Sequence, residues 1–385
     1  MLYHRFQTTF QSLIRSKRRN FSKCKNSSES AEKIAPLCEV ERFITECMVS
    51  VGVEEPKANI FAHSLVQADS RGIHSHGLNR LENYVKDVKD KLCDANAQPT
   101  ITKEAASTAL VSGHNGLGAV VGKFCMDLAI DKASKTGVGL VAANGSNHFG
   151  VNLQYSMQAM EKGFIGMCFT NTSPVMVPTG AKKVALGTNP LSLAAPGECG
   201  DSFVADFATT AVSLGKIEIH KRDNKKIPEG WALNDQGKQE TDPAIALKAK
   251  KLMPLGATSS YKGTGLALIV EIFCGLLADA KYGPNVRFWG QMPPEEANLG
   301  QSFLAINPEN FAPGFGHRLS DLLNYIRKLE PADPKHPVMV PGDPEKLHMK
   351  IIEEQGGIIY PKSIMDVVEK LSKELCVQII EYKTK

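Results

Sequence analysis

The segment "STALVSGHNGLGAVVGKFCMDLAIDKASKTGVGLVAANG", residues 107–145, indicates the architecture of the chain most directly. Two short runs at its ends, 107–113 and 137–145, are rich in small and β-branched residues and are predicted to be strands. Between them, 117–135 carries apolar residues at helical spacing. A strand, a helix and a second strand in succession indicate a layered α/β core with some parallel pairing.

The same alternation continues along the chain and gives way to helices at both ends. Further strands are predicted at 164–171 and 301–307, with a helix at 151–162 between the strands of this region. Helical patterns cluster near the termini, at 38–51, 56–69, 78–91, 316–329, 344–355 and 362–375. The sequence therefore predicts an α/β core flanked by two helical regions.

Two other segments have a distinctive composition. Residues 259–280 are predicted to form a helix that is apolar on all faces except at Glu271, so we expect this helix to be buried. Lys262 lies at its N-terminus, which suits a phosphate group, although a glycine turn with a solvated lysine is the alternative. The highly charged segment 220–243 is predicted to be an exposed loop or hairpin, with Trp231 packed against the core.

Composition excludes several classes of protein. The chain has 385 residues, 42% of them hydrophobic and 22% charged, which is enough for a large core and two or three domains. Seven of the 45 Lys and Arg residues lie in 1–28, leaving 38 basic against 41 acidic side chains elsewhere, so no nucleic-acid partner is expected. The charge-free run 163–181 contains two prolines and many polar residues, so no membrane span is expected.

The N-terminal region has the composition of a mitochondrial transit peptide. Residues 1–28 are basic, contain no Asp or Glu, and carry Phe6, Phe10 and Leu13 at helical spacing. We expect a leader at 1–33 and a mitochondrial location; a basic tail on a cytoplasmic protein is the alternative. The nine cysteines include no C-x-x-C pair, which favours a reducing compartment over a disulfide framework or a zinc site.

The motif "HSHGLNR" combines groups that could act on a carboxylic acid. His76 lies four residues before Arg80, so an imidazole could move a proton beside a guanidinium that binds a carboxylate. A helix cap and a solvated arginine are the alternative. His74 and His76 could also bind a metal ion, but no third ligand follows at a fixed spacing, and no metal is expected. The chain has no G-x-G-x-x-G between a strand and a helix and no P-loop, which argues against a Rossmann site.

An ordered set of motifs resembles the malate/L-lactate/ureidoglycolate/L-sulfolactate dehydrogenase family, the type-2 2-hydroxyacid oxidoreductases that lack a Rossmann fold. The resemblance covers about 36–375 and rests on "ADSRGIHSHGLNRLENY", "NGSNHFG", "FTNTSPVMVPTGAKK", "LGTNPLSLAAP", "VADFATT", "GWALNDQGKQETDP", "YKGTGLAL", "INPENFAP" and "VPGDPE". One departure is Thr264, which stands where many members have tyrosine.

The resemblance implies an architecture and an activity. It implies a non-Rossmann NAD(P)-binding fold in which a discontinuous helical domain, 34–100 plus 310–385, surrounds a mixed-sheet α/β core at 101–309. It also implies a homodimer with the site in the cleft between these parts. The expected reaction is reversible hydride transfer between NAD or NADP and a small 2-hydroxy acid such as malate or lactate. The alternative is a catalytically inactive dinucleotide-binding or interaction protein on the same fold.

The resemblance further implies roles for individual residues. Either His76 or His148 would move the proton, and Asp206 would work with Ser75 and His76. Arg80 and Tyr84 match positions that bind the substrate carboxylate. The matching cofactor positions are Thr172, Asp206, Ala208, Thr209, Thr210, Tyr261, Lys262, Gly342, Asp343 and Pro344.

Overall fold

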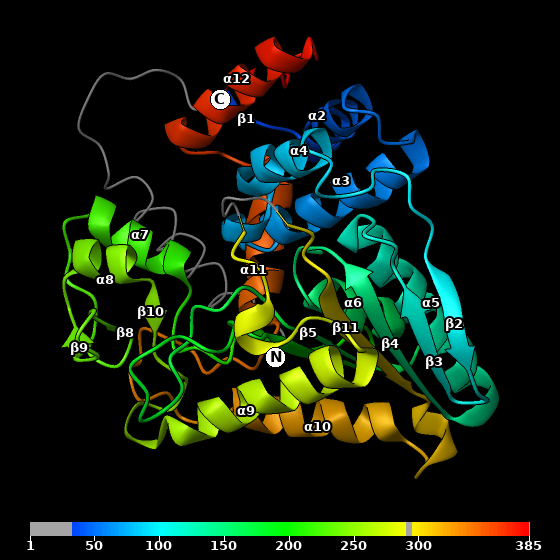
Figure 1. Cartoon of the computed structure of the whole chain (residues 1–385). Coiled ribbons are helices and arrows are strands. Elements are labelled where there is room, and N and C mark those ends of the chain that lie inside the picture. Colours follow the sequence, from blue (N-terminus) through cyan, green and yellow to red (C-terminus); the bar gives the residue numbers. More distant parts are fainter. Residues whose placement is uncertain (1–32, 290–294, 385) are drawn as a thin grey trace.

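The computed structural model describes residues 33–289 and 295–384, so most of the expected leader lies outside the described residues. A seven-stranded mixed sheet with the order β2-β3-β4-β11-β5-β6-β7 forms its centre (Figure 1). Only β3 and β4 pair in parallel, as the β-α-β pattern predicted, and the other neighbours are antiparallel. The strands are β2 (Thr100–Glu104), β3 (Thr108–Ser112), β4 (Val138–Ser146), β5 (Ile165–Thr170), β6 (Leu191–Pro196), β7 (Ser202–Phe207) and β11 (Leu299–Ile306).

Helices cover both faces of this sheet. α5 (Gly118–Thr136) and α6 (Leu153–Met160) pack on one face. α9 (Tyr261–Glu271) and the π-helical turn that follows it pack on the other. Neighbouring strand residues point to opposite faces: Val141 contributes to the core under α5, and Ala142 to the core on the other side.

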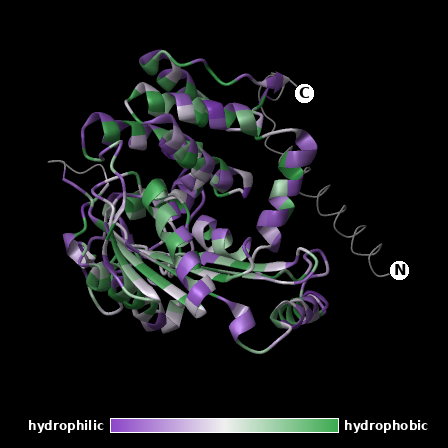
Figure 2. Ribbon diagram, turned by 90° about the vertical axis from the view of Figure 1, so that its right-hand side faces the viewer, coloured by the Kyte–Doolittle hydropathy of each residue, from purple (hydrophilic) through white to green (hydrophobic). Residues whose placement is uncertain are grey.

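A group of helices from both ends of the chain forms a second core. The group consists of α2 (Leu37–Ser50), α3 (Glu55–Ser70), α4 (Leu81–Lys89), α11 (Asp343–Gln355) and α12 (Lys362–Leu375). One continuous cluster joins Phe43 and Leu65 to Ile352 and Leu371. Two short strands, β1 (Lys33–Ile34) and β12 (Lys383–Thr384), pair with each other. Figure 2 shows this helical group above the sheet, whose strands are rich in apolar residues.

α10 (Phe315–Arg327) departs from the domain boundary expected from the sequence. The resemblance assigned it to the helical domain, but it packs against β7 at the edge of the sheet. Ser320 on this helix accepts a hydrogen bond from the backbone N–H of Glu198, 2.9 Å away, in the β6–β7 connection. The C-terminal part of the helical group therefore begins at α11.

The expectation that the helix in 259–280 is fully buried is wrong for one of its faces. Ala267, Val270 and Cys274 are buried against the sheet. Five apolar residues on the other side are between 45% and 55% exposed, namely Leu268, Ile269, Ile272, Leu276 and Leu277. An apolar helix surface predicts burial but does not say whether the same chain supplies the cover.

The charged segment around Trp231 lies in a small lobe beside the sheet. This lobe consists of α7 (Leu214–Arg222), β8 (Ala232–Leu233), β9 (Gln239–Glu240), α8 (Pro243–Ala249) and β10 (Lys251–Leu252). β8 and β9 form an antiparallel hairpin, and Trp231 packs partly buried against Ile217 and its neighbours. Among the described residues no helix is long and apolar enough to cross a membrane.

Candidate active site

The loop between α3 and α4 is organised by the buried carboxylate of Asp69. Its Oδ2 accepts hydrogen bonds from the backbone N–H of Leu78 at 2.8 Å and from the hydroxyl of Tyr360 at 2.7 Å. Its Oδ1 lies 2.9 Å from Nδ1 of His74. Gly77 packs so closely that a Cβ there would lie 2.1 Å from the Asp69 carboxyl group, which explains the glycine. His74 therefore helps to hold the loop that carries the candidate catalytic residues.

Two imidazoles from distant parts of the sequence meet beside this loop. The rings of His76 and His148 are nearly parallel, with centroids 5.7 Å apart. Ser75 Oγ lies 2.8 Å from Nδ1 of His76. The hydroxyl of Tyr84 hydrogen bonds to Nδ1 of His148, and the backbone N–H of Gly150 also approaches that nitrogen at 3.3 Å. The structure thus brings together four of the residues predicted for the site.

The surroundings keep both imidazoles neutral. Burial and, to a smaller extent, the nearby positive charge of Arg80 lower the pKa of His76 to about 4. Burial also lowers the pKa of His148 well below its usual value, with contributions from His76 and Arg80. Burial raises the pKa of Tyr84, so its phenol stays protonated. At neutral pH both histidines are therefore in the form that accepts a proton.

The guanidinium of Arg80 lies near both imidazoles and is held at one of its nitrogens. Its Nε donates a hydrogen bond to the backbone carbonyl of Ser75 at 2.7 Å. Its two terminal nitrogens make no hydrogen bond to any residue of 33–289 or 295–384. A planar guanidinium that is fixed at Nε and open at the other edge can bind a carboxylate through two hydrogen bonds.

Trp289 belongs to the same cluster and was not predicted from the sequence. Its ring stacks on His148 with centroids 4.7 Å apart and contacts Tyr84 edge-on at 5.2 Å. Asp87 accepts a hydrogen bond from its indole nitrogen at 3.0 Å. The only sequence signal is an aromatic residue two positions after an arginine, in a segment without helical or strand periodicity.

A cavity of about 440 Å³ is lined by several of the predicted cofactor residues. Asp206, Gly342 and Pro344 line it, together with the cationic Arg71 and Lys346. Ile73 and Leu153, which also line it, are close in sequence to His76 and His148. A cavity of this size with cationic side chains suits part of a phosphate-bearing cofactor.

Asp206 does not make the contacts that the resemblance implied. Within the described residues it forms no hydrogen bond to Ser75 or His76, and its Oδ2 instead accepts the backbone N–H of Leu153 at 2.8 Å. It thus caps the start of α6. Burial raises the pKa of Asp206 to about 7, so the carboxyl group is close to half-ionised at neutral pH. A carboxyl group with this pKa beside a cavity keeps Asp206 among the catalytic candidates.

The raised pKa of Asp206 predicts a loss of stability as the pH rises from acid to neutral. The folded state binds a proton more readily than the unfolded chain, so the free energy of unfolding should fall as the pH rises from about 4 to 7, by no more than about 4 kcal/mol. Asp206→Asn still accepts the Leu153 N–H but does not ionise. Chemical denaturation at pH 5 and pH 8.5 should therefore show the variant gaining stability relative to the wild type at the higher pH. Parallel pH dependences would contradict this prediction.

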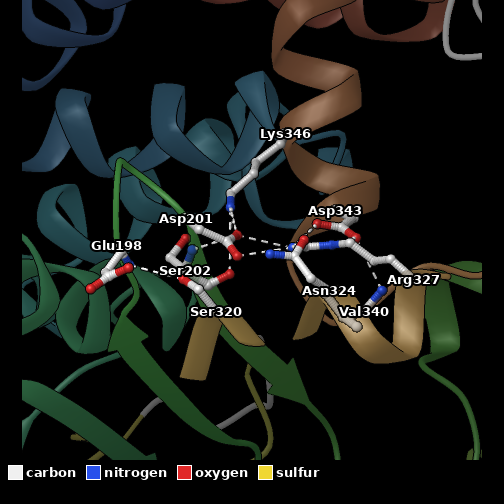
Figure 3. Close-up of polar contacts among 9 residues, drawn as sticks. All are labelled: Glu198, Asp201, Ser202, Ser320, Asn324, Arg327, Val340, Asp343 and Lys346. Atoms are coloured by element: carbon white, nitrogen blue, oxygen red, sulfur yellow. Dashed lines mark hydrogen bonds and ion pairs between the residues drawn. The ribbon is translucent and has the colours of Figure 1, made fainter. Parts of the chain in front are cut away.

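The predicted cofactor residue Asp343 has a different role from the one implied. Figure 3 shows Arg327 between two carboxylates, with its nitrogens 2.8–3.0 Å from Asp343 and Asp201. Asp343 Oδ2 also accepts the backbone N–H of Val340 at 3.1 Å. The Asp343 side chain therefore anchors the loop, while Gly342 and Pro344 form the cavity wall.

Two of the threonines predicted to bind the cofactor, Thr172 and Thr209, are joined through Thr188. Thr172 Oγ1 accepts the backbone N–H of Thr188 at 2.8 Å, and Thr209 Oγ1 donates to the Thr188 carbonyl at 2.9 Å. Thr210 Oγ1 donates to the carbonyl of Val212 at 2.9 Å. The hydroxyls of Thr209 and Thr210 thus hold the backbone after β7.

The start of α9 lies next to this threonine group. The backbone N–H of Leu255 donates to the Thr209 carbonyl at 2.8 Å. Lys262 is exposed and has its ammonium 6.0 Å from the centre of the Tyr261 ring, while Ala208 is half-buried. Neither Lys262 nor Tyr261 lines the cavity that contains Asp206. Within the described residues, no three His, Cys, Asp or Glu side chains gather as a metal site.

The chain combines a non-Rossmann mixed sheet with a helical group built from both chain ends and a candidate site for a carboxylate. These features identify the class of proteins with which it is compared. The family model "Malate/L-lactate dehydrogenase" matches residues 36–369. A malate dehydrogenase of Pyrococcus abyssi is 36% identical, over 90% of this chain and 96% of its own length. An L-sulfolactate dehydrogenase of Methanocaldococcus jannaschii is 38% identical, over 89% of this chain and 97% of its own. The structure of an Entamoeba histolytica malate dehydrogenase superposes with a TM-score of 0.85 at 29% identity, covering 90% of this chain and 99% of that one.

The chain belongs to the malate/L-lactate dehydrogenase family. It is a 2-hydroxyacid oxidoreductase, and its reaction needs a nicotinamide cofactor. The fold class and the enzyme class predicted from the sequence are confirmed by these comparisons.

Proposed function

We propose that this enzyme interconverts a small 2-oxo acid and its 2-hydroxy acid, of the malate or lactate type, at the site formed by Arg80, His76 and His148. The observation that carries the proposal is the open edge of the Arg80 guanidinium beside two neutral imidazoles. This arrangement can hold a carboxylate and move a proton on the adjacent carbon's oxygen. The malate and sulfolactate dehydrogenases among the relatives support this substrate class.

Arg80 would bind the substrate and, through this binding, change the pKa of the two histidines. A carboxylate on its open edge offsets the positive charge that lowers the pKa of His76 and His148. Binding therefore raises the pKa of His76 from its value of about 4 towards neutral pH. A pKa closer to the working pH favours proton transfer in both directions. Burial, the larger cause of the low pKa, remains.

The two histidines would have different tasks. Tyr84 stays protonated and donates to Nδ1 of His148, so the His148 proton lies on Nε2 and can hydrogen bond to the substrate oxygen. His76, oriented by Ser75 at its Nδ1, would take the proton from the substrate hydroxyl or return it. The nicotinamide, when bound, accepts or supplies the hydride at its C4 atom.

The cavity beside Asp206 and the start of α9 are the candidate cofactor regions. Gly342 and Pro344 would face the dinucleotide, with Arg71 and Lys346 available to its phosphates. Lys262 at the start of α9 remains a candidate for a further phosphate contact. Either NAD or NADP could supply the same chemistry.

A panel of 2-oxo acids assayed with NADH and with NADPH tests the proposal. We expect reduction of at least one small substrate, such as oxaloacetate, pyruvate or 3-sulfopyruvate, and a preference for one of the two cofactors. The absence of turnover with every 2-oxo acid and both cofactors, in a protein that still binds NADH or NADPH, would favour the inactive dinucleotide-binding alternative.

The enzyme is also proposed to be a homodimer, with the exposed apolar side of α9 and of the π-helical turn after it, here called the α9 strip, at the interface. The five half-exposed residues between Leu268 and Leu277 support this, because a soluble monomer rarely leaves so large an apolar strip uncovered. A second copy of the chain could cover the strip with its own, as in a two-fold interface.

A charge placed on the α9 strip should split such a dimer. Ile272 is 54% exposed, and Ile272→Glu should convert the dimer to a monomer, measured as mass by light scattering. Ile245, which is 47% exposed in the small lobe, provides a matched control, so Ile245→Glu should leave the mass unchanged. A monomeric wild type, or a dimer that survives Ile272→Glu, would contradict this assignment.

Residues 1–33 are proposed to direct the enzyme to mitochondria. Their basic, acid-free composition supports this proposal. A fusion of 1–33 to a fluorescent protein should localise to mitochondria in eukaryotic cells, and a diffuse cytoplasmic signal would favour the alternative of a basic tail.

A further inference from the structure

Trp289 is fixed beside His148 by contacts from two other parts of the chain. Its indole Nε1 donates to Asp87 Oδ2 at 3.0 Å, and its backbone N–H donates to Ser173 Oγ at 3.1 Å. The same Asp87 oxygen accepts a hydrogen bond from Arg287 at 2.9 Å, in an ion pair whose two members are buried. The indole therefore cannot turn away from His148 without breaking a buried polar network.

Three side chains surround the imidazole of His148. The rings of Trp289 and His76 are both nearly parallel to it, at 4.7 and 5.7 Å. Trp289 and His76 have no ring contact with each other in the described part of the chain. Tyr84 occupies Nδ1, whereas Nε2 has no hydrogen-bond partner within 33–289 and 295–384.

We propose that Trp289, held by Asp87, is a positioning and size-selecting residue: its indole fixes the His148 ring and limits the side chain of the substrate whose oxygen reaches Nε2. This inference rests on the proposed function. It adds a substrate class to that function, namely 2-oxo acids with short, unbranched side chains.

The size limit follows from the stiffness and position of the indole. A substrate that places its carboxylate on Arg80 and its oxygen at His148 Nε2 must lie beside the Trp289 ring. The indole has few rotatable bonds, and its hydrogen bond to Asp87 fixes its orientation. A branched or aromatic substrate side chain would therefore have to displace the indole, whereas a methyl or carboxymethyl group would not.

The test is the ratio of kcat/KM for 4-methyl-2-oxopentanoate to kcat/KM for pyruvate. The ratio does not depend on how much of each preparation is folded, so a general loss of stability leaves it unchanged. We expect it to rise by about ten-fold or more in Trp289→Ala, the range for a change of pocket size, and by an intermediate factor in Trp289→Phe. Trp231→Phe, at the chain's other tryptophan, is the control and should keep the wild-type ratio. Equal ratios in the wild type and both Trp289 variants would overturn the inference, and Trp289→Phe decides alone if Trp289→Ala does not fold.

A second measurement needs no turnover. In Trp231→Phe, Trp289 is the only tryptophan, so saturable changes of its emission on adding pyruvate or oxaloacetate report a ligand beside it. If these acids alter the emission but are never reduced, the proposed function fails and the ligand site at Trp289 stands. An active enzyme whose emission and selectivity ratio both stay constant overturns this inference and leaves the proposed function intact. An inactive protein with constant emission overturns both.

Discussion

Replacing His76 by asparagine should lower kcat by about two to four orders of magnitude, the range expected when a general acid–base is lost. Asparagine preserves the approximate shape of the side chain and can still hydrogen bond to Ser75, whose Oγ lies 2.8 Å from the imidazole in the wild type. It cannot take up the proton of the substrate hydroxyl. Because the cavity proposed for the cofactor is lined by other residues, the dissociation constant for NADH or NADPH should change little. Steady-state kinetics and a cofactor titration measure the two quantities.

Two further variants make the assignment to His76 specific. His148→Gln keeps a group that can donate a hydrogen bond to the substrate oxygen. If His148 acts only as a hydrogen-bond donor, this variant should lower kcat less than His76→Asn does. His317→Asn alters an exposed histidine on α10 and serves as the control, with activity unchanged. Activity of His76→Asn within a few-fold of the wild type would assign the proton to His148 or to water.

Much of the fold was predictable because its elements have local signals. The strands at 107–113 and 137–145 contain small and β-branched residues, and the helix between them has an apolar stripe. β6 and β7 were missed as strands, since "LSLAAPGECGDSFVADF" mixes alanine, glycine, proline and acidic residues. Their pairing depends on the neighbouring strand β5, which local composition does not reveal.

The site was predictable only where it depends on neighbours in the sequence. The spacing of His76 and Arg80 indicated that they lie close together, and the loop held by Asp69 does place both near His148. By contrast, the Asp343 partner Arg327 lies on another helix, so the sequence motif could not show that this carboxylate is already paired. Trp289 owes its position to Asp87, 202 residues earlier, and no local pattern links the two.

The buried polar groups explain why these distant segments can form one site. Asp69 receives hydrogen bonds from the loop that carries His76 and from Tyr360 near the C-terminus. Asp87 receives them from Arg287 and Trp289. Each carboxylate joins segments that the helical group and the sheet bring together, and a buried carboxylate without these donors would be costly. Packing of the two chain ends is therefore coupled to the geometry of the two imidazoles.

Replacing Arg80 by leucine should lower kcat/KM for a 2-oxo acid by about three orders of magnitude, because two charge-assisted hydrogen bonds to the carboxylate are lost. Arg80→Lys should lose about two orders, since a lysine keeps the charge but not the planar edge that the Ser75 carbonyl fixes at Nε. The amide of the same 2-oxo acid lacks the negative charge, so it should be a poor substrate for the wild type. Its kcat/KM should fall little further in either variant. Arg222→Lys, at an exposed position on α7, should leave all these values unchanged. Suppose that Arg80→Leu lowered kcat/KM for the acid and for its amide by the same factor. Arg80 would then not bind the carboxylate, and its role would be confined to lowering the pKa of the two histidines.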